Sequence, residues 1–162
     1  DQVEVDMGKP EFAAQQVPIL LDPVEGWYRL DIDQQTYKLG AASMGNPHAL
    51  VLVDDIETAE VARLGAAIGS NPVFPQGCNV GFAQIIDREH IRLRVYERGA
   101  AETRACGSGA CAAMTILHNA GLVENRIKVT QTGGILIINW TKGDKSVIMK
   151  GHATHVFEGN LA

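Results

Sequence analysis

Alternating hydrophobic and polar residues run through most of the chain and predict short β-strands. The clearest stretches are rich in β-branched residues or carry an apolar residue at every second position, as is typical of strands. We expect strands at 3–5, 28–32, 49–53, 91–96, 127–129, 135–140 and 147–149. Turn residues bound many of them, such as Gly133-Gly134 and Lys142-Gly143-Asp144. The pattern therefore predicts a fold rich in β-sheet.

Two segments have helical rather than alternating periodicity. The first, at about 57–69, places Val61, Leu64 and Ile68 on one face and predicts an amphipathic helix that covers a surface. The second runs from near Gly107 to Gly121, and the chain has no Asp, Glu, Lys or Arg from 105 to 123. A helix that is apolar all round must be enclosed on every side.

The sheet is the structure available to enclose that apolar helix. We therefore predict an α+β fold in which a strongly curved, mainly antiparallel sheet wraps partly around one central helix. The 162 residues suit a single domain that spans 1–162.

Composition excludes several classes of function. Hydrophobic residues make up 46% and charged residues 20%, as in an ordinary globular protein. The net charge is −5, and Glu97 interrupts the densest basic stretch, Arg92, Arg94 and Arg98, so we expect no nucleic-acid partner. No apolar run approaches the roughly 20 residues of a membrane span, and we expect no membrane partner.

Three cysteines, Cys78, Cys106 and Cys111, cannot all pair within one chain. Nothing at the N-terminus resembles a secretion signal, so we expect reduced thiols and a cytoplasmic location. The sequence begins at Asp1 rather than at a methionine, which indicates a trimmed chain, a processed product or a fragment.

Cys106 lies at the start of the predicted buried helix, directly before Gly-Ser-Gly at 107–109. The first N–H groups of a helix lack intrahelical partners and, with the helix dipole, favour an anion there. Such a position can lower the pKa of a thiol or hold a substrate carboxylate beside the sulfur. The alternative is that Cys106 is a small buried residue and the glycines form a tight turn.

Cys111, five residues into the uncharged helix, is predicted to be a core residue. We expect no metal at Cys106 and Cys111, because their spacing lacks a second pair of ligands. A sulfur–sulfur redox pair is a third option.

Four short motifs follow one another along the chain. They are Met-Gly-Asn-Pro-His at 44–48, Phe-Pro-Gln-Gly-Cys-Asn-Val-Gly-Phe at 74–82, Val-Tyr-Glu-Arg-Gly-Ala at 95–100 followed by Glu102-Thr103, and Ala-Cys-Gly-Ser-Gly-Ala at 105–110. Their order and spacing resemble the C-terminal half of diaminopimelate epimerase. The resemblance extends from Val-Asp-Met-Gly at 5–8 to His-Val-Phe-Glu-Gly at 155–159, essentially the whole chain.

The resemblance implies an isomerase that interconverts LL- and meso-diaminopimelate without a cofactor, for lysine and peptidoglycan synthesis. It implies two pseudo-symmetric halves, each a curved sheet around a central helix, with the substrate in the cleft between them. Each half supplies one cysteine. One thiolate removes the α-proton, and the other thiol delivers a proton to the opposite face.

The resemblance also assigns roles to residues of this chain. Cys106 matches the C-terminal thiol, Glu97 accepts the α-ammonium group and influences the charge on Cys106, and His48 lies near the partner thiol. The N–H groups of Gly107 and Ser108 bind the α-carboxylate.

At the far end of the substrate, the resemblance assigns binding to Asn46, Asn79 and the Arg98 guanidinium, with Arg98 suited to the distal carboxylate. Local sequence alone also allows a turn at Asn46-Pro47, a strand-end cap at Asn79, a solvated ion pair of Glu97 with Arg98, and a surface histidine at 48.

The family's N-terminal half, with its own Cys-Gly-x-Gly turn, has no match in this sequence. Cys78 does not replace its thiol, because Cys78 lies in a Gln-Gly-Cys-Asn-Val loop where the family commonly carries an aliphatic residue. We expect the chain alone to be inactive, with the N-terminal half as its partner, and the resemblance also allows a homodimer.

The family's last strand crosses to the N-terminal half. We therefore expect residues 152–162, and also 2–8, to be return segments with an exposed edge, a swapped partner or poor order.

Two alternatives stay open. One is another two-thiol racemase or epimerase of the proline racemase type, which shares the Cys-Gly-x-Gly turn. The other is a non-catalytic amino-acid-binding domain that retains the carboxylate-binding helix start.

Overall fold

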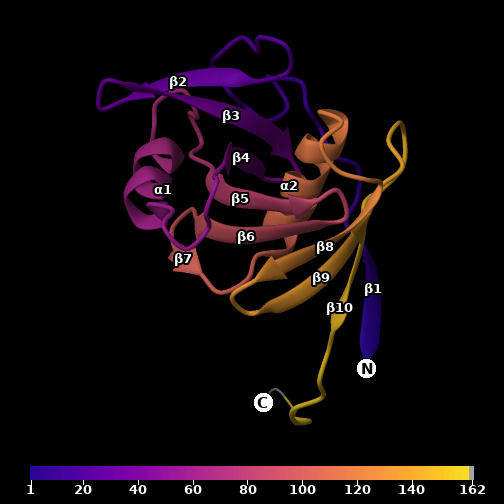
Figure 1. Cartoon of the computed structure of the whole chain (residues 1–162). Coiled ribbons are helices and arrows are strands. Elements are labelled where there is room, and N and C mark those ends of the chain that lie inside the picture. Colours follow the sequence, from indigo (N-terminus) through magenta and orange to yellow (C-terminus); the bar gives the residue numbers. More distant parts are fainter. Residues whose placement is uncertain (161–162) are drawn as a thin grey trace.

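The structure, a computed structural model, describes residues 1–160 as a ten-stranded sheet with two helices (Figure 1). The helices are α1 (Val61–Gly69) and α2 (Gly107–Asn119). The strands, in chain order, are β1 (Gln2–Asp6), β2 (Tyr28–Ile32), β3 (Gln35–Ser43), β4 (Pro47–Leu52), β5 (Asn79–Asp87), β6 (His90–Glu97), β7 (Ala101–Thr103), β8 (Arg126–Gln131), β9 (Gly134–Asn139) and β10 (Ile148–His152).

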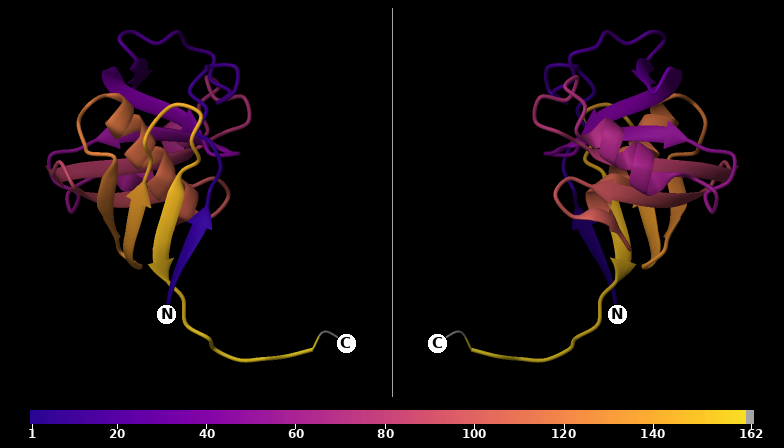
Figure 2. Two further views of the ribbon diagram at one scale, coloured as in Figure 1. Left: turned by 90° about the vertical axis from the view of Figure 1, so that its right-hand side faces the viewer. Right: turned by 90° about the vertical axis from the view of Figure 1, so that its left-hand side faces the viewer.

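The strands form one curved sheet in the order β1-β10-β9-β8-β6-β5-β4-β3-β2, and β7 pairs with β6 outside this path. All neighbouring pairs are antiparallel except β4–β5 and β6–β8. In Figures 1 and 2, strands β8, β9, β10 and β1 turn steeply away from the other strands, and α2 lies inside the bend. The predicted α+β fold, a mainly antiparallel sheet wrapped around one helix, is confirmed.

Helix α2 is buried along its length, as its uncharged sequence predicts. Every residue from Gly109 to Leu117 is buried, and most of their apolar side chains belong to a core cluster that includes Leu93 of β6 and Ile138 of β9. At Gly40, a Cβ atom would lie 2.3 Å from Cγ2 of Ile116, so β3 approaches the helix more closely than any side chain permits. Of the helices in residues 1–160, none is long and apolar enough to cross a membrane.

Helix α1 covers the opposite face of the sheet. Its buried residues Val61, Leu64 and Ile68 belong to a second core cluster that also contains Phe82 of β5. Because helices or loops cover both faces, β4 and the first half of β5 are buried at successive positions. Such strands lack the alternation of a half-exposed strand. The alternating pattern does not predict β5 for this reason, and it does not predict β3.

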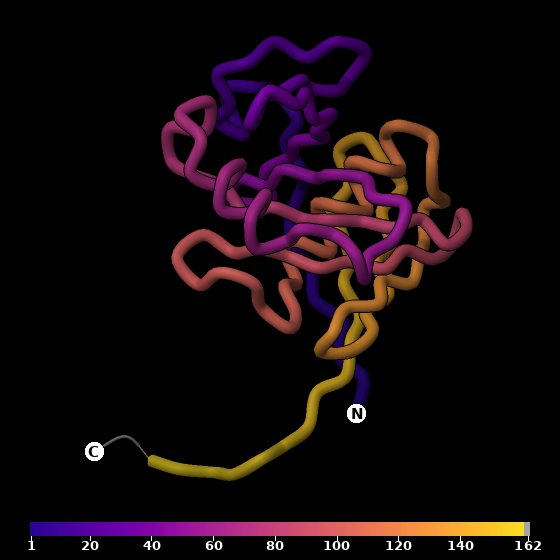
Figure 3. The backbone as a smooth tube through the Cα atoms, turned by 60° about the vertical axis from the view of Figure 1, so that its left-hand side comes forward, coloured from indigo at the N-terminus to yellow at the C-terminus, as the bar shows by residue number. Residues whose placement is uncertain are grey.

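The two ends of the chain differ from each other. Residues 2–8 were expected to be a return segment with an exposed edge, a swapped partner or poor order, and here β1 pairs along its whole length with β10 at the edge of the sheet. The open side of β1 is an exposed edge, with Val3 45% and Val5 41% exposed. Residues 153–160 have no regular structure, are exposed and extend away from the body (Figure 3). The last two residues of the expected return segment, 161–162, lie outside the described residues.

Candidate active site

The predicted site residues gather where several strand ends meet the start of α2. Strands β4 and β5 are parallel, so His48 and Asn79, near their first residues, lie side by side. Strand β6 is antiparallel to β5, so its last residue, Glu97, reaches the same edge. The resemblance assigns all three of these residues to one site, and the topology brings them together.

Cys106 is the N-cap of α2 and combines an extended backbone with a side chain turned toward the helix. Its φ and ψ are −140° and 111°, and its carbonyl oxygen accepts the Ala110 N–H at 3.0 Å. The Gly109 N–H donates to Sγ at 3.4 Å, and Ser108 Oγ lies 3.6 Å from Sγ. A thiol seldom occupies this position, which usually belongs to an oxygen-bearing side chain. The helix start therefore holds a sulfur atom where its N–H groups converge.

The electrostatics of Cys106 are set by opposing effects. Burial raises the pKa of the thiol most strongly, and the nearby Glu97 carboxylate raises it further. The hydrogen bonds from Ser108 and the Gly109 N–H lower this pKa, as expected of a helix start. Burial outweighs them, so the net pKa is above the ordinary value of a thiol and the neutral form is favoured.

The Glu97 carboxylate is fixed beside the thiol by a neighbouring side chain. The Thr103 hydroxyl donates to Glu97 Oε1 at 2.5 Å, and the hairpin of β6 and β7 pairs Glu97 with Ala101. The first two N–H groups of α2, from Gly107 and Ser108, have no acceptor within residues 1–160. A pair of N–H groups and a carboxylate therefore flank one sulfur.

A second cluster of polar side chains, formed by Asn46, His48, Asn79 and Arg98, lies next to Glu97. Asn79 Oδ1 accepts the backbone N–H of Arg98 at 2.9 Å, which fixes the turn after β6. The Arg98 side chain lies against Gly77 and donates through Nη1 to the Gln76 carbonyl oxygen at 2.5 Å. Its Nε and Nη2 groups have no acceptor in the described part of the chain. Arg98 therefore retains donors suited to a carboxylate.

His48 and Asn46 complete this cluster. His48 is 2% exposed, and its Nε2 lies 3.0 Å from Oδ1 of Asn46. Burial lowers the pKa of His48 to about 4, so the imidazole is neutral at physiological pH. The local alternative of a surface histidine is wrong, because the residue is buried.

The other two cysteines are core residues. Cys78 and Cys111 have no exposed surface, and burial raises the pKa of each to about 12. All three cysteines are free thiols. The prediction that Cys111 belongs to the core is confirmed, and Cys78 is as inaccessible as Cys111.

Sequence reasoning missed Gln131, the last residue of β8. Its side chain bonds to both backbone polar groups of Cys106: Oε1 accepts the N–H at 2.7 Å, and Nε2 donates to the carbonyl oxygen at 3.3 Å. A signal was present in the sequence. Ile127 and Val129 face the core, so the alternation places a polar Gln131 on the same inward face.

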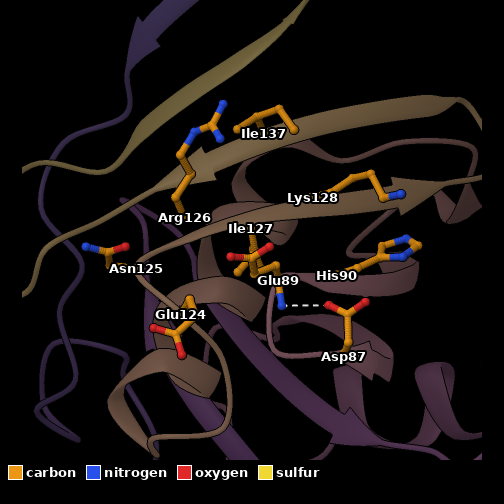
Figure 4. A pocket seen from close by; sticks show the side chains of 9 residues that line it. All are labelled: Asp87, Glu89, His90, Glu124, Asn125, Arg126, Ile127, Lys128 and Ile137. Carbon is orange, nitrogen blue, oxygen red and sulfur yellow. Dashed lines mark hydrogen bonds between the residues drawn. The ribbon is translucent and has the colours of Figure 1, made fainter.

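A large groove lies far from these residues. It has a volume of about 540 Å³ and lies at the end of β6 that begins with His90, whereas Glu97 ends the strand (Figure 4). Carboxylates and cations both line it, and one of the carboxylates, Asp87, accepts the Glu89 N–H. The remaining lining residues shown in Figure 4 are Glu124, Asn125, Arg126, Ile127, Lys128 and Ile137. The groove presents no single charge and contains no thiol.

Solved structures share this fold. A hydroxyproline epimerase from Agrobacterium vitis, with bound trans-4-hydroxy-L-proline, matches 93% of this chain and 48% of its own, with a TM-score of 0.62 and 18% identity. A probable proline racemase from Agrobacterium radiobacter K84 matches 93% of this chain and 49% of its own, with a TM-score of 0.60 and 22% identity. The sheet around a central helix is therefore a fold that this chain shares with both proteins, and these low identities support the fold alone.

Sequence similarity is more specific. The family model described as diaminopimelate epimerase matches residues 40–156. A diaminopimelate epimerase from Thioalkalivibrio sulfidiphilus (strain HL-EbGR7) is 47% identical over 161 residues, 99% of this chain. The chain belongs to the diaminopimelate epimerase family. It spans 58% of the length of that relative.

Proposed function

We propose that this chain is the half of a diaminopimelate epimerase that carries one of two catalytic thiols. The observation that carries the proposal is the helix start at Cys106, where a buried sulfur lies between a carboxylate, Glu97, and the unpaired N–H groups of Gly107 and Ser108. An α-amino acid presents an ammonium group and a carboxylate on one carbon atom. This arrangement matches both groups, and a substrate held by both would present its α-hydrogen to the sulfur.

In the proposed reaction, one thiolate takes the α-proton and a thiol on the opposite face donates a proton to the same carbon. The S–H bond that breaks on one side is replaced by the S–H bond that forms on the other. Cys106 is favoured as the neutral thiol, the proton-donating form, by burial and by Glu97. Its partner thiol comes from the N-terminal half, and no cofactor takes part.

The α-carbanion that forms between these steps is stabilised by position and electrostatics. The N–H groups of Gly107 and Ser108 neutralise charge that develops on the α-carboxylate, in the manner of an oxyanion hole. Water is excluded because Cys106 is only 6% exposed before the second half covers it.

The cluster of Asn46, His48, Asn79 and Arg98 favours a substrate with a second charged end. Arg98 has free guanidinium donors, Asn79 accepts its backbone N–H, and Asn46 contacts His48, the strand partner of Asn79, so these groups suit the distal carboxylate and ammonium groups of diaminopimelate. His48 is neutral and buried next to Asn46, and we assign it to the environment of the partner thiol. Proline has no charged group at its far end, which disfavours a proline racemase-type substrate.

The product is a precursor of lysine and peptidoglycan, and we assign the enzyme to the cytoplasm. Three free cysteines are consistent with a reducing compartment. The required partner is the remaining part of the epimerase, and a homodimer of the completed enzyme is compatible with this assignment.

The test is deuterium uptake at the α-carbon of diaminopimelate in heavy water. The 162-residue chain alone is expected to give no uptake above background. The same chain joined to the segment of the Thioalkalivibrio relative that it does not cover is expected to give sustained uptake. Turnover by the chain alone, or uptake into proline but not diaminopimelate, contradicts the proposal.

A further inference from the structure

The peptide group that carries the sulfur is held by a side chain from a distant strand. The Gln131 amide pairs with Cys106 in both directions, as one strand pairs with another, through bonds of 2.7 and 3.3 Å. Cys106 cannot pair within the helix at its N–H, because it is the N-cap. Gln131 therefore supplies the acceptor that this buried N–H needs.

The choice of glutamine at this position is informative. The side chain is 6% exposed and follows Ile127 and Val129 on the core face of β8, where an apolar residue would be expected. Burying an amide is unfavourable unless its hydrogen bonds are made. Both ends of the Gln131 amide are paired with Cys106, so the polar residue serves this one contact.

The turn that follows Gln131 reinforces the contact. The Gly133 N–H donates to the Arg104 carbonyl oxygen at 2.6 Å, two residues before the thiol. A Cβ atom at Gly133 would lie 3.0 Å from that oxygen and 3.1 Å from Cβ of Ala105. The end of β8 and the turn after it thus bind Arg104 and Cys106 through hydrogen bonds, immediately before the helix begins.

We propose that Gln131 is a positioning residue for Cys106, which fixes the direction of the Cα–Cβ bond and hence the location of the sulfur. The effect of Gln131 on catalysis rests on the proposed function, whereas its effect on the placement of Cys106 does not. A sulfur that must meet the α-carbon from one face cannot move with a mobile loop, because a misplacement of about 1 Å costs roughly a hundredfold in rate.

The first experiment measures alkylation of Cys106 by iodoacetamide against pH in the 162-residue chain, with the modified site identified by mass spectrometry. Q131M keeps an unbranched side chain of similar size and removes both hydrogen bonds. Its Cys106 is expected to react about tenfold faster, the factor that corresponds to one lost hydrogen bond. The pH midpoint is expected to fall, because a released loop loses part of the burial that raises the pKa.

Gln84 provides a matched control. Its amide also spans a backbone segment, since Oε1 accepts the Ile56 N–H at 3.3 Å and Nε2 donates to the Asp54 carbonyl oxygen at 2.9 Å. Q84M removes the same kind of contact from a loop that does not carry Cys106. It is expected to lower the melting temperature less than Q131M does, because Gln84 is less buried, and to leave the alkylation of Cys106 unchanged.

Conservative substitution separates positioning from folding. Q131E retains an acceptor for the Cys106 N–H, and its alkylation rate is expected to lie between those of the parent and Q131M. Alkylation of the buried Cys78 and Cys111 reports global unfolding. If Q131M exposes these two thiols, the alkylation rates of Cys106 in Q131E and Q84M are compared instead. A faster rate in Q131E than in Q84M supports positioning by Gln131, and equal rates would overturn it.

In the epimerase completed with the missing segment, Q131M is expected to lower kcat 10- to 100-fold and change KM less than threefold. An unchanged alkylation profile and an unchanged kcat, with only a lower melting temperature, would overturn the inference. If alkylation responds but no variant or parent exchanges the α-proton, Gln131 still positions Cys106 and the proposed function fails instead.

Discussion

The thiol of Cys106 illustrates how two adjacent effects set the behaviour of one residue. The start of α2 offers the Gly109 N–H and the Ser108 hydroxyl, which stabilise a thiolate, while burial and Glu97 favour the neutral thiol. Burial has the larger effect. A substrate ammonium group beside Glu97 would offset the carboxylate charge, so substrate binding is expected to bring the thiol closer to ionisation.

The Ser108 hydroxyl can be removed to measure its share of this balance. S108A deletes a hydrogen bond that lowers the pKa of Cys106, so that pKa is expected to rise further. Alkylation of Cys106 at neutral pH should slow by roughly three- to tenfold, since one net hydrogen bond to a charged group is lost. T115A, which loses a hydroxyl bonded to the Ala112 carbonyl oxygen within the same helix, is the control. Faster alkylation in S108A would contradict this balance.

His48 makes the stability of the fold depend on pH. Its pKa is about 4 in the folded chain and 6.5 in the unfolded chain. Between these values the unfolded chain binds the extra proton, so stability is complete above pH 6.5 and falls as the pH drops toward 4. The loss amounts to about 3 kcal/mol at most.

Urea unfolding of the parent and of H48Q at several pH values checks this expectation. H48Q keeps polar groups near Asn46 but does not titrate, so the difference in stability between the two proteins should narrow as the pH falls through this window. A constant difference from pH 7 to pH 4 would show that the imidazole is not held neutral.

Ala101 has a backbone conformation that favours glycine. It follows the turn after Glu97 and Arg98, and its φ is +60°. An alanine in this region costs about 1–2 kcal/mol, and glycine loses about 0.5–1 kcal/mol of chain entropy instead. A101G is therefore expected to stabilise the chain by up to about 1 kcal/mol in chemical denaturation. A100G, at a neighbour without positive φ, is expected to destabilise it slightly. Equal effects of both substitutions would argue against strain at Ala101.

At the scale of elements, the local periodicity of the sequence predicts both helices. The amphipathic pattern over 57–69 predicts α1, and the uncharged stretch after 105 predicts the buried α2. Strand β5 escapes prediction because both of its faces are covered, which removes the alternation. In β3 the small residues Gly40 and Ala42 face α2 and leave room for it, a reason that only the packed structure reveals.

Part of the candidate site is likewise predictable from the sequence, and part is not. Its motif residues carry a recognisable spacing, and the structure gathers them at one sheet edge. The contact of Gln131 with Cys106 joins residues 25 positions apart, so no short motif contains it. The net rise of the Cys106 pKa also depends on burial, which the sequence around the helix start does not determine.

The approach of β3 to α2 gives a prediction for packing. In G40A the new methyl group would lie 2.3 Å from Cγ2 of Ile116, so the strand or the helix must shift. Overpacking of this kind is expected to cost about 1–3 kcal/mol in the free energy of unfolding. The double variant G40A/I116A should be less destabilised than the sum of its single variants, because the second change makes room. Strict additivity would exclude this contact as the cause.

At the scale of the whole molecule, the surfaces left open suit a chain that works beside another segment. Val3 and Val5 are exposed on the edge strand, and Val156 and Phe157 are 82% and 79% exposed in the extended tail. An open edge strand is a place where a further strand can pair. The chain covers 58% of the Thioalkalivibrio relative. Under the proposed function, the remaining part of the epimerase would cover the tail and close the site over Cys106.

The central claim is that the sulfur of Cys106 exchanges a proton with the α-carbon of the substrate. The most direct test compares deuterium uptake into diaminopimelate by the completed epimerase with Cys106 intact and with C106A, while circular dichroism verifies that both are folded. Loss of a positioned acid–base group is expected to slow uptake by about 10²–10⁴-fold. Uptake by a folded C106A enzyme at the parental rate would contradict the account.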